Sequence, residues 1–120
     1  MNYKGIYTCQ TCENQINSPK HGYLQWQNNK KLQYYDFRIV HHLTYSPLKT
    51  KNEDGCYAFK SDEKLNDLPL DWFYGIEGLD FLLKMSMRKT FDGAPKILYR
   101  KDFEKLFFRL YNFPFFVGNC

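Results

Sequence analysis

The sequence predicts a single α+β domain in which a small antiparallel β-sheet packs against C-terminal helices. Strand-like alternation of apolar and polar residues dominates residues 1–60, whereas apolar residues recur at helical spacing in residues 61–120. The chain has 120 residues, which is close to the commonest domain size, and no repeat or flexible linker divides it. We therefore expect one domain over residues 1–120, with a β-rich first half and a helical second half.

The expected strands of the first half are separated by turn-forming residues. Residues 3–8 form a short strand candidate, and residues 17–22 form a turn by composition. Residues 23–27 alternate in strand fashion, and the polar residues 28–31 suit a hairpin turn. Residues 35–41, rich in aromatic and β-branched side chains, are then the returning strand.

The second half shows two helical patterns. Asp67 and Pro69 suit the start of a short helix through Phe73, which Gly75 ends. An apolar stripe then predicts a helix to about Lys89; its members are Ile76, Leu79, Leu82, Leu83 and Met87. The last helix has the clearest pattern, with Asp102 as its expected cap and an apolar face made of Phe103, Leu106, Phe107, Leu110 and Tyr111.

Cys9 and Cys12 are separated by two residues, a spacing that lets both sulfurs bind one tetrahedral ion. Cys56 is the expected third ligand. Neighbouring strand residues point to opposite faces, so His41 and His42 do not easily bind the same ion. We expect His41 as the fourth ligand because it shares its face with residues 37 and 39, and His42 is the alternative.

Three cysteines and one histidine suit zinc, and four protein ligands would make a closed, structural site. The fold is then a zinc-knuckle sheet with C-terminal helices, in which residues 1–60 bind Zn²⁺. The alternatives are free thiols in the core, or disulfides in an exported protein. Cys120 is expected to be a spare thiol. The apolar segment 113–117 is expected to fold onto the core or to meet a partner.

The net charge of +4 belongs to the first half, which contains eight Lys and Arg residues and four Asp and Glu residues. The candidate partner-binding residues are Lys30, Lys31, Arg38, Lys49 and Lys51. Such residues suit an acidic protein or nucleic-acid phosphates, and the alternative is an ordinary solvated surface. No apolar run is long enough to span a membrane, and no apolar signal core follows the N-terminus, so we expect a cytoplasmic protein.

Residues 39–45, Ile-Val-His-His-Leu-Thr-Tyr, resemble a segment of HNH endonucleases. The resemblance implies that His41 touches metal and that His42 is the catalytic base. The chain departs from that pattern because no histidine follows His42, and no second Cys-x-x-Cys occurs. Asn66 is the one asparagine in a suitable context for the motif. The resemblance covers about seven of the 120 residues.

Over more of its length the chain resembles an uncharacterised type of small protein from bacteria and their phages. The shared features are the Cys9/Cys12 pair, the strand ending in His41 and His42, the later Cys56, and residues 72–79 at a helix start. This resemblance implies zinc and a compact fold. We expect a non-enzymatic binding module, an inhibitor or modulator of a host protein complex. A nucleic-acid-binding zinc protein and a divergent HNH-type nuclease are the alternatives.

Overall fold

The computed structural model describes residues 7–59 and 65–111, and it has the α+β architecture that the sequence predicts. Strands β1 (Tyr7–Thr8) and β2 (Gln15–Ile16) form a small antiparallel hairpin. Strands β3 (Gly22–Asn28), β4 (Tyr34–His41) and β5 (Leu65–Pro69) form an antiparallel sheet in the order β4-β3-β5. The fold class is therefore confirmed, and the predicted hairpin turn is present at residues 29–33, because Asn28 still pairs with Tyr34 as part of β3.

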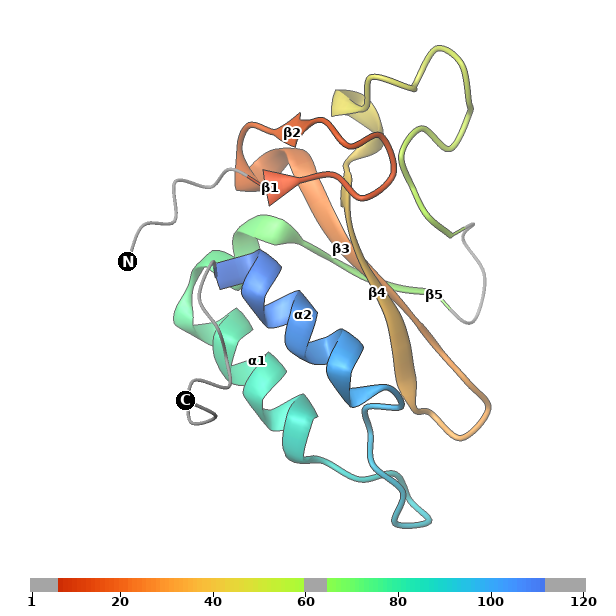
Figure 1. Ribbon diagram of the computed structural model, residues 1–120, viewed down its shortest axis with the longest axis vertical. Helices are drawn as coiled ribbons and strands as arrows, with labels where there is room; N and C mark the ends of the chain where they lie inside the picture. The colour runs from red at the N-terminus through yellow and green to blue at the C-terminus, as the bar shows by residue number, and fades with distance from the viewer. Residues whose placement is uncertain (1–6, 60–64, 112–120) are drawn as a thin grey trace.

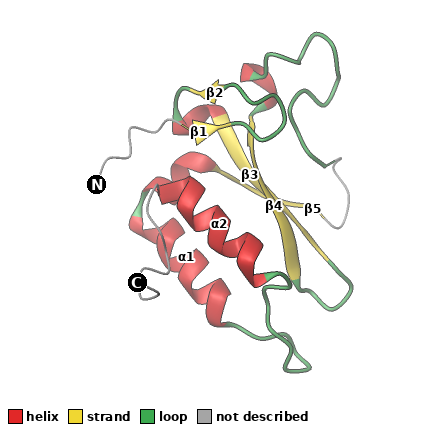
Figure 2. Cartoon of the chain, viewed as in Figure 1, coloured by secondary structure: helices red, strands yellow, loops and turns green. Residues whose placement is uncertain are grey.

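Helices α1 (Ile76–Met87) and α2 (Arg100–Tyr111) lie side by side on one face of the three-stranded sheet (Figure 1). Short 3₁₀ helices connect the longer elements: η1 (Pro19–His21), η2 (Leu43–Tyr45) and η3 (Leu70–Tyr74). Figure 2 shows the β1–β2 hairpin and the long loop after β4 beyond one end of the helix-covered sheet, away from both long helices. The candidate metal ligands come from that end.

Aromatic side chains fill the space between the sheet and the helices. The ring centroid of Phe37 on β4 lies 5.7 Å from that of Trp26 on β3 and 5.4 Å from that of Phe103 on α2. Trp26 also meets Phe81 of α1 at 6.2 Å between ring centroids. Burying such large rings is the main favourable contribution to this packing. The five α2 residues expected to face the core are all buried.

Three expectations for the second half are wrong in detail. The predicted short helix is present as η3, with Pro69 at its N-cap and Gly75 at its C-cap, but Asp67 belongs to strand β5 and not to the helix start. Pro69 ends this edge strand, where a missing N–H is tolerated. Ile76 and Met87, expected in the α1 stripe, are 81% and 73% exposed. Asp102 lies in the first turn of α2, which begins at Arg100, and so is not its cap.

The buried face of α1 differs from the apolar stripe that the sequence predicts, because the helix packs closely against η3. Its buried residues are Gly78, Leu82 and Met85. A Cβ atom at Gly78 would lie 2.5 Å from the Cα of Phe73 and 2.6 Å from the carbonyl oxygen of Trp72. Only glycine permits this approach of two backbones. The rings of Trp72 and Phe73 contact Phe81 of α1, with centroids 5.3 and 6.4 Å apart.

Candidate metal centre

The structure brings together the four side chains that the sequence selects: Cys9, Cys12, His41 and Cys56. Their ligand atoms all lie within 4.8 Å of one another, an arrangement that could hold a metal ion. His41 Nδ1 lies 3.4 Å from Cys12 Sγ and 3.7 Å from Cys56 Sγ. Sulfur and nitrogen ligands of one tetrahedral ion are about 3.5 Å apart, given metal–ligand distances of about 2.3 and 2.0 Å.

The turn between β1 and β2 positions the first two cysteines. The N–H of Cys9 donates to the Asn14 carbonyl at 2.9 Å, and the N–H of Glu13 donates to the Cys9 carbonyl at 2.9 Å. Glu13 takes a left-handed conformation, with φ of 65°, that closes this turn. The result is a knuckle, residues 9–14, that points both sulfurs toward β4.

Gln10 fastens the knuckle to β4. Its N–H donates to the Ile39 carbonyl at 2.8 Å, and its side-chain Oε1 accepts from the Ile39 N–H at 2.8 Å. Ile39 lies on β4, the edge strand, so these groups would otherwise lack a sheet partner on that side. The fastening places the knuckle next to His41, two residues further along the strand.

His41 has both ring nitrogens engaged. Nδ1 faces the two sulfurs, and Nε2 lies 2.9 Å from the carbonyl oxygen of Gln15, to which it donates. That hydrogen bond places the proton on Nε2 and leaves the Nδ1 lone pair free to bind a metal ion. Carbonyl partners of this kind orient most metal-binding histidines. His41 is 4% exposed, and Cys9 and Cys56 are fully buried.

The loop after β4 carries Cys56 back to the knuckle. Thr11 Oγ1 donates to the Cys56 carbonyl at 2.6 Å, and Ser46 Oγ lies 2.9 Å from Cys56 Sγ. Gly55 takes φ of +55°, and a Cβ there would lie 2.7 Å from Leu43. The loop is held at its far end by the buried Gln25, whose Oε1 accepts from the Ala58 N–H.

The thiols differ in acidity. Burial raises the pKa of the Cys56 thiol to about 12; the Ser46 hydroxyl acts in the opposite direction, and nearby Cys9 raises the pKa further. For Cys9, burial also acts to raise the pKa. Hydrogen bonds from the backbone of Cys12, His41 and Thr11 outweigh burial, and the pKa lies below 9.0. A cation at this position would favour the thiolate of both residues.

His42, the alternative ligand, is outside the group. Its Nδ1 accepts from the Thr44 N–H at 3.1 Å, capping η2. Its ring lies among tyrosines, with the centroid 5.1 Å from Tyr23 and 6.4 Å from Tyr57. The ligand group therefore contains His41 and not His42, as the strand alternation predicts.

The five candidate partner-binding residues do not form one patch. Lys30 and Lys31 lie in the β3–β4 turn, next to the Asn28–Tyr34 pair at one end of the two strands. Lys49 and Lys51 follow the other end, in the loop after His41, and Figure 1 shows these two segments at opposite ends of the molecule. Arg38 lies between them and forms an ion pair with Asp36 at 2.9 Å.

Several supporting residues carry no sequence pattern that marks them. Gln10, Gln15, Thr11 and Ser46 act through hydrogen bonds to residues distant in the sequence, and their types are common in any loop. Cys120 and residues 113–117 lie outside the described residues. Within the described ranges, no helix combines the length and apolar character needed to cross a membrane.

Comparison with known proteins found no matching family model, no matching curated protein and no matching solved structure.

Proposed function

We propose that this chain is a non-enzymatic binding module stabilised by zinc. The observation that carries the proposal is the convergence of Cys9, Cys12, His41 and Cys56 on one point. Three thiolates and one imidazole are ligands that zinc accepts in tetrahedral structural sites. The four side chains fill all four positions, so the ion has no open position for water or substrate.

The zinc would link parts of the chain that lie far apart in the sequence. The knuckle, the end of β4 and the Cys56 loop lie beyond the helix-covered part of the sheet (Figure 2). The free energy of binding a structural ion is also folding free energy, because the unfolded chain has no preformed site. Zinc therefore supports a binding surface instead of supplying chemistry.

The partner is a protein, and the module acts as an inhibitor or modulator of a host complex of the kind that phages target. Exposed aromatic side chains support a protein partner, because aromatic residues are enriched at protein interfaces. They include Tyr45, Tyr74, Phe91, Tyr99 and Phe108. Phe91 has the most exposed of these rings, and it stands on a turn closed by the Thr90–Ala94 backbone hydrogen bond.

A nucleic-acid-binding zinc protein is the second candidate, and the net charge of +4 favours it. The separation of Lys30 and Lys31, in the β3–β4 turn, from Lys49 and Lys51, in the loop after β4, weakens this candidate.

The test compares retention of host proteins and of nucleic acid on the immobilised protein. We expect a host protein to remain bound to the immobilised protein after nuclease treatment and in moderate salt. Phe91→Ala should reduce the retention of that host protein without changing the melting temperature of the module. Lys30→Glu with Lys31→Glu should slow association more than it speeds dissociation, because rim charges act mainly by steering. Tight binding to a short oligonucleotide that weakens steeply with salt would favour the second candidate instead.

A further inference from the structure

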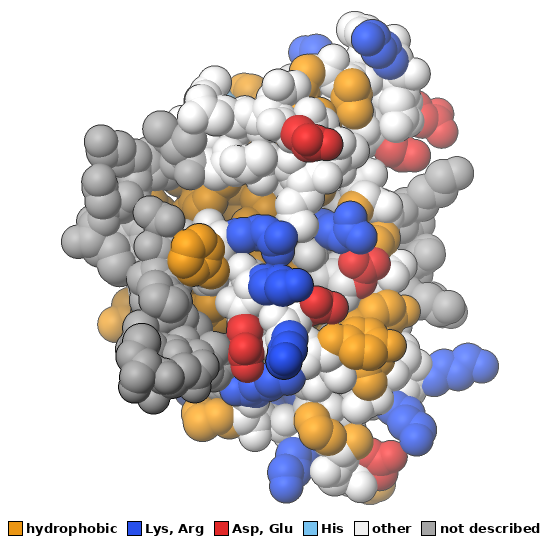
Figure 3. Space-filling view, in the orientation of Figure 1, with side chains coloured by type: hydrophobic (Ala, Val, Ile, Leu, Met, Phe, Trp, Pro, Cys, Tyr) orange, Lys and Arg blue, Asp and Glu red, His pale blue; other side chains and the backbone are white. Residues whose placement is uncertain are grey.

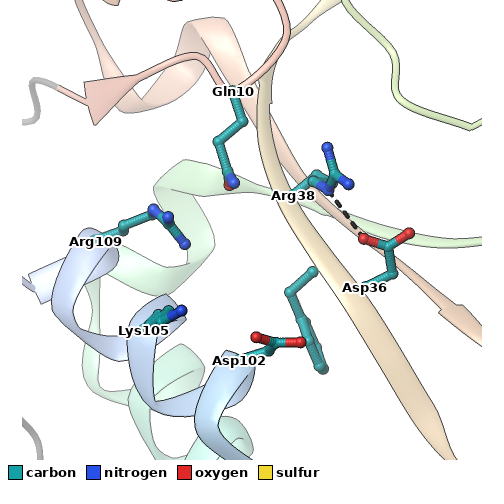
Figure 4. Close-up of a pocket in the computed structure, with 7 residues that line it drawn as sticks. Gln10, Asp36, Arg38, Asp102, Lys105 and Arg109 are labelled. Carbon is teal, nitrogen blue, oxygen red and sulfur yellow. Dashed lines mark hydrogen bonds and ion pairs between the residues drawn. The ribbon is translucent and has the colours of Figure 1, made fainter. Parts of the chain in front are cut away.

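A polar pocket lies between α2, β4 and the knuckle, and none of the four candidate metal ligands lines it. Its open volume is about 210 Å³. The lining residues are Gln10, Asp36, Phe37, Arg38, Asp102, Lys105 and Arg109 (Figure 4). Three of the lining residues are cations. Figure 3 shows Lys and Arg side chains near the centre of the visible face, where α2 lies.

Two of the cations come from one face of α2. Lys105 and Arg109 are four residues apart, so they are neighbours on the helix surface, where like charges destabilise the helix. Within the described part of the chain, no carboxylate lies within 4.0 Å of either charge. Among the described residues, Lys105 and Arg109 thus bring two positive charges to the pocket that form no ion pair.

The third cation, Arg38, is held in place by a residue with an unusual backbone. Asp36 takes φ of 59°, and the pairing register of β3 and β4 shifts between Gln25 and Gln27, which marks a bulge. Bulges redirect side chains, and a left-handed non-glycine residue is a recognised sign of a functional constraint. The Asp36 carboxylate accepts from Arg38 Nε at 2.9 Å, so both terminal nitrogens of Arg38 stay available.

Gln10 supplies a neutral donor. Its Oε1 is occupied by the Ile39 N–H, which leaves its side-chain amide nitrogen as the group available to a ligand. Figure 4 shows Gln10 descending from the knuckle toward the gap that Arg109 enters from α2. Donors from three separate elements therefore line the same pocket.

We propose that this pocket binds a single phosphate group. Guanidinium and ammonium donors around a small polar hollow match a tetrahedral oxyanion that carries more than one charge. Asp36 and Asp102 line the same pocket and repel any anion there. The three cations exceed the two carboxylates by one charge, which suits one phosphate group better than the adjacent phosphates of a nucleic-acid strand. Free phosphate and a small phosphomonoester share the required chemistry, and the site does not depend on which protein the module binds.

The test uses the full chain as purified, titrated with inorganic phosphate, with adenosine 5′-monophosphate, and with a short single-stranded oligonucleotide at constant ionic strength. NMR shifts of the Gln10 side-chain amide and the Arg38 Nε–H report binding. We expect saturable binding of phosphate or the monoester, weakened about tenfold or more in Arg109→Gln and in Lys105→Gln, because charge-assisted hydrogen bonds are strong. The tighter of the two ligands identifies the source of the group.

Lys101→Gln is the matched control, because Lys101 is exposed on the same helix but does not line the pocket. Its binding curve should match that of the wild-type protein, and the melting temperatures of all three variants verify folding. Absence of saturable binding overturns the proposal. Equal weakening by Lys101→Gln also overturns it, since it would indicate diffuse attraction. An oligonucleotide that binds far more tightly than the monoester overturns the single-phosphate site in favour of a nucleic-acid track.

Discussion

The Nε2 atom of His41 lies 2.9 Å from the backbone oxygen of Gln15, which joins the last residue of β4 to the first residue of β2. The hydrogen bond fixes the ring orientation and keeps the proton away from Nδ1, the atom that faces Cys12 and Cys56. The backbone of β2 therefore helps to orient a candidate ligand on β4. Loss of His41 should consequently affect both metal binding and the seating of the knuckle.

The first prediction concerns metal content. Protein purified without chelator should contain about one zinc per chain, because one four-ligand group is present in the described ranges. Cys12→Ser should lose the metal and lower the free energy of unfolding by about 3 kcal/mol or more, part of the roughly 10–16 kcal/mol that structural zinc contributes. Cys120→Ser, the control, should change neither. Metal analysis and urea unfolding measure these effects, and metal-free wild-type protein would contradict the assignment.

The second prediction separates the two adjacent histidines. His41→Ala should abolish the tetrahedral thiolate spectrum of the cobalt-substituted protein, since His41 Nδ1 belongs to the ligand group. His42→Ala should keep that spectrum, and it should lose only the η2 cap and the ring contacts with tyrosines. A cap of this kind is worth about 1 kcal/mol. If His42→Ala alone lost the spectrum, the ligand assignment would be wrong.

The third prediction concerns pH. Because burial raises the pKa of Cys56 to about 12, its thiol is protonated at neutral pH in the metal-free fold. Zinc must displace that proton. The apparent zinc affinity should therefore fall about tenfold for each unit by which the pH is lowered, for each proton displaced. Competition with a chelator at several pH values measures this slope, and calorimetry in buffers of different ionisation enthalpy counts the protons. A pH-independent affinity would exclude thiol deprotonation.

The metal-free protein should show the opposite sign. The folded-state pKa of Cys56 lies above the ordinary value of 9.0, so the protonated thiol stabilises the fold below pH 9. That contribution is lost as the pH rises toward 12.

Ser46 Oγ, 2.9 Å from Cys56 Sγ, favours the thiolate. Ser46→Ala should therefore weaken zinc binding about tenfold, the lower end of the effect of such supporting residues.

Residue chemistry and short-range periodicity account for what could be predicted from the sequence. The Cys9–Cys12 spacing and the distant His41 and Cys56 indicate the metal group because few other roles need those types together. The buried face of α2 follows its 3.6-residue period. Both features depend on local pattern or on ligand chemistry.

The features that were mispredicted or missed depend on tertiary register. Strand β5 has weak β-propensity and is extended because it pairs with β3. The α1 face is set by the close approach of Gly78 to η3, which no periodicity reveals. Lys105 joins Arg38 at one pocket across more than sixty residues of chain, a proximity that charge counting cannot show.

The fourth prediction tests the contact between α1 and η3. Gly78→Ala would place a Cβ 2.5 Å from the Phe73 Cα, so the two backbones must separate. We expect a loss of about 1–3 kcal/mol in the free energy of unfolding, typical of overpacking. Gly75→Ala is the control, because the nearest atom to a Cβ there is 4.0 Å away. Equal effects of the two substitutions in thermal or urea unfolding would disprove the close approach.

The last prediction is that the protein does not cleave DNA or RNA with magnesium, manganese or added zinc. An HNH-type reaction needs a metal site with an open position beside the base. Here His41 belongs to a group of four protein ligands, and His42 uses Nδ1 to cap η2. No histidine follows His42 in the sequence to complete another site. Gel assays with plasmid DNA and RNA should show no cleavage above background. Reproducible cleavage that vanishes in His42→Ala but persists in Lys101→Gln would establish a nuclease and reverse the non-enzymatic assignment.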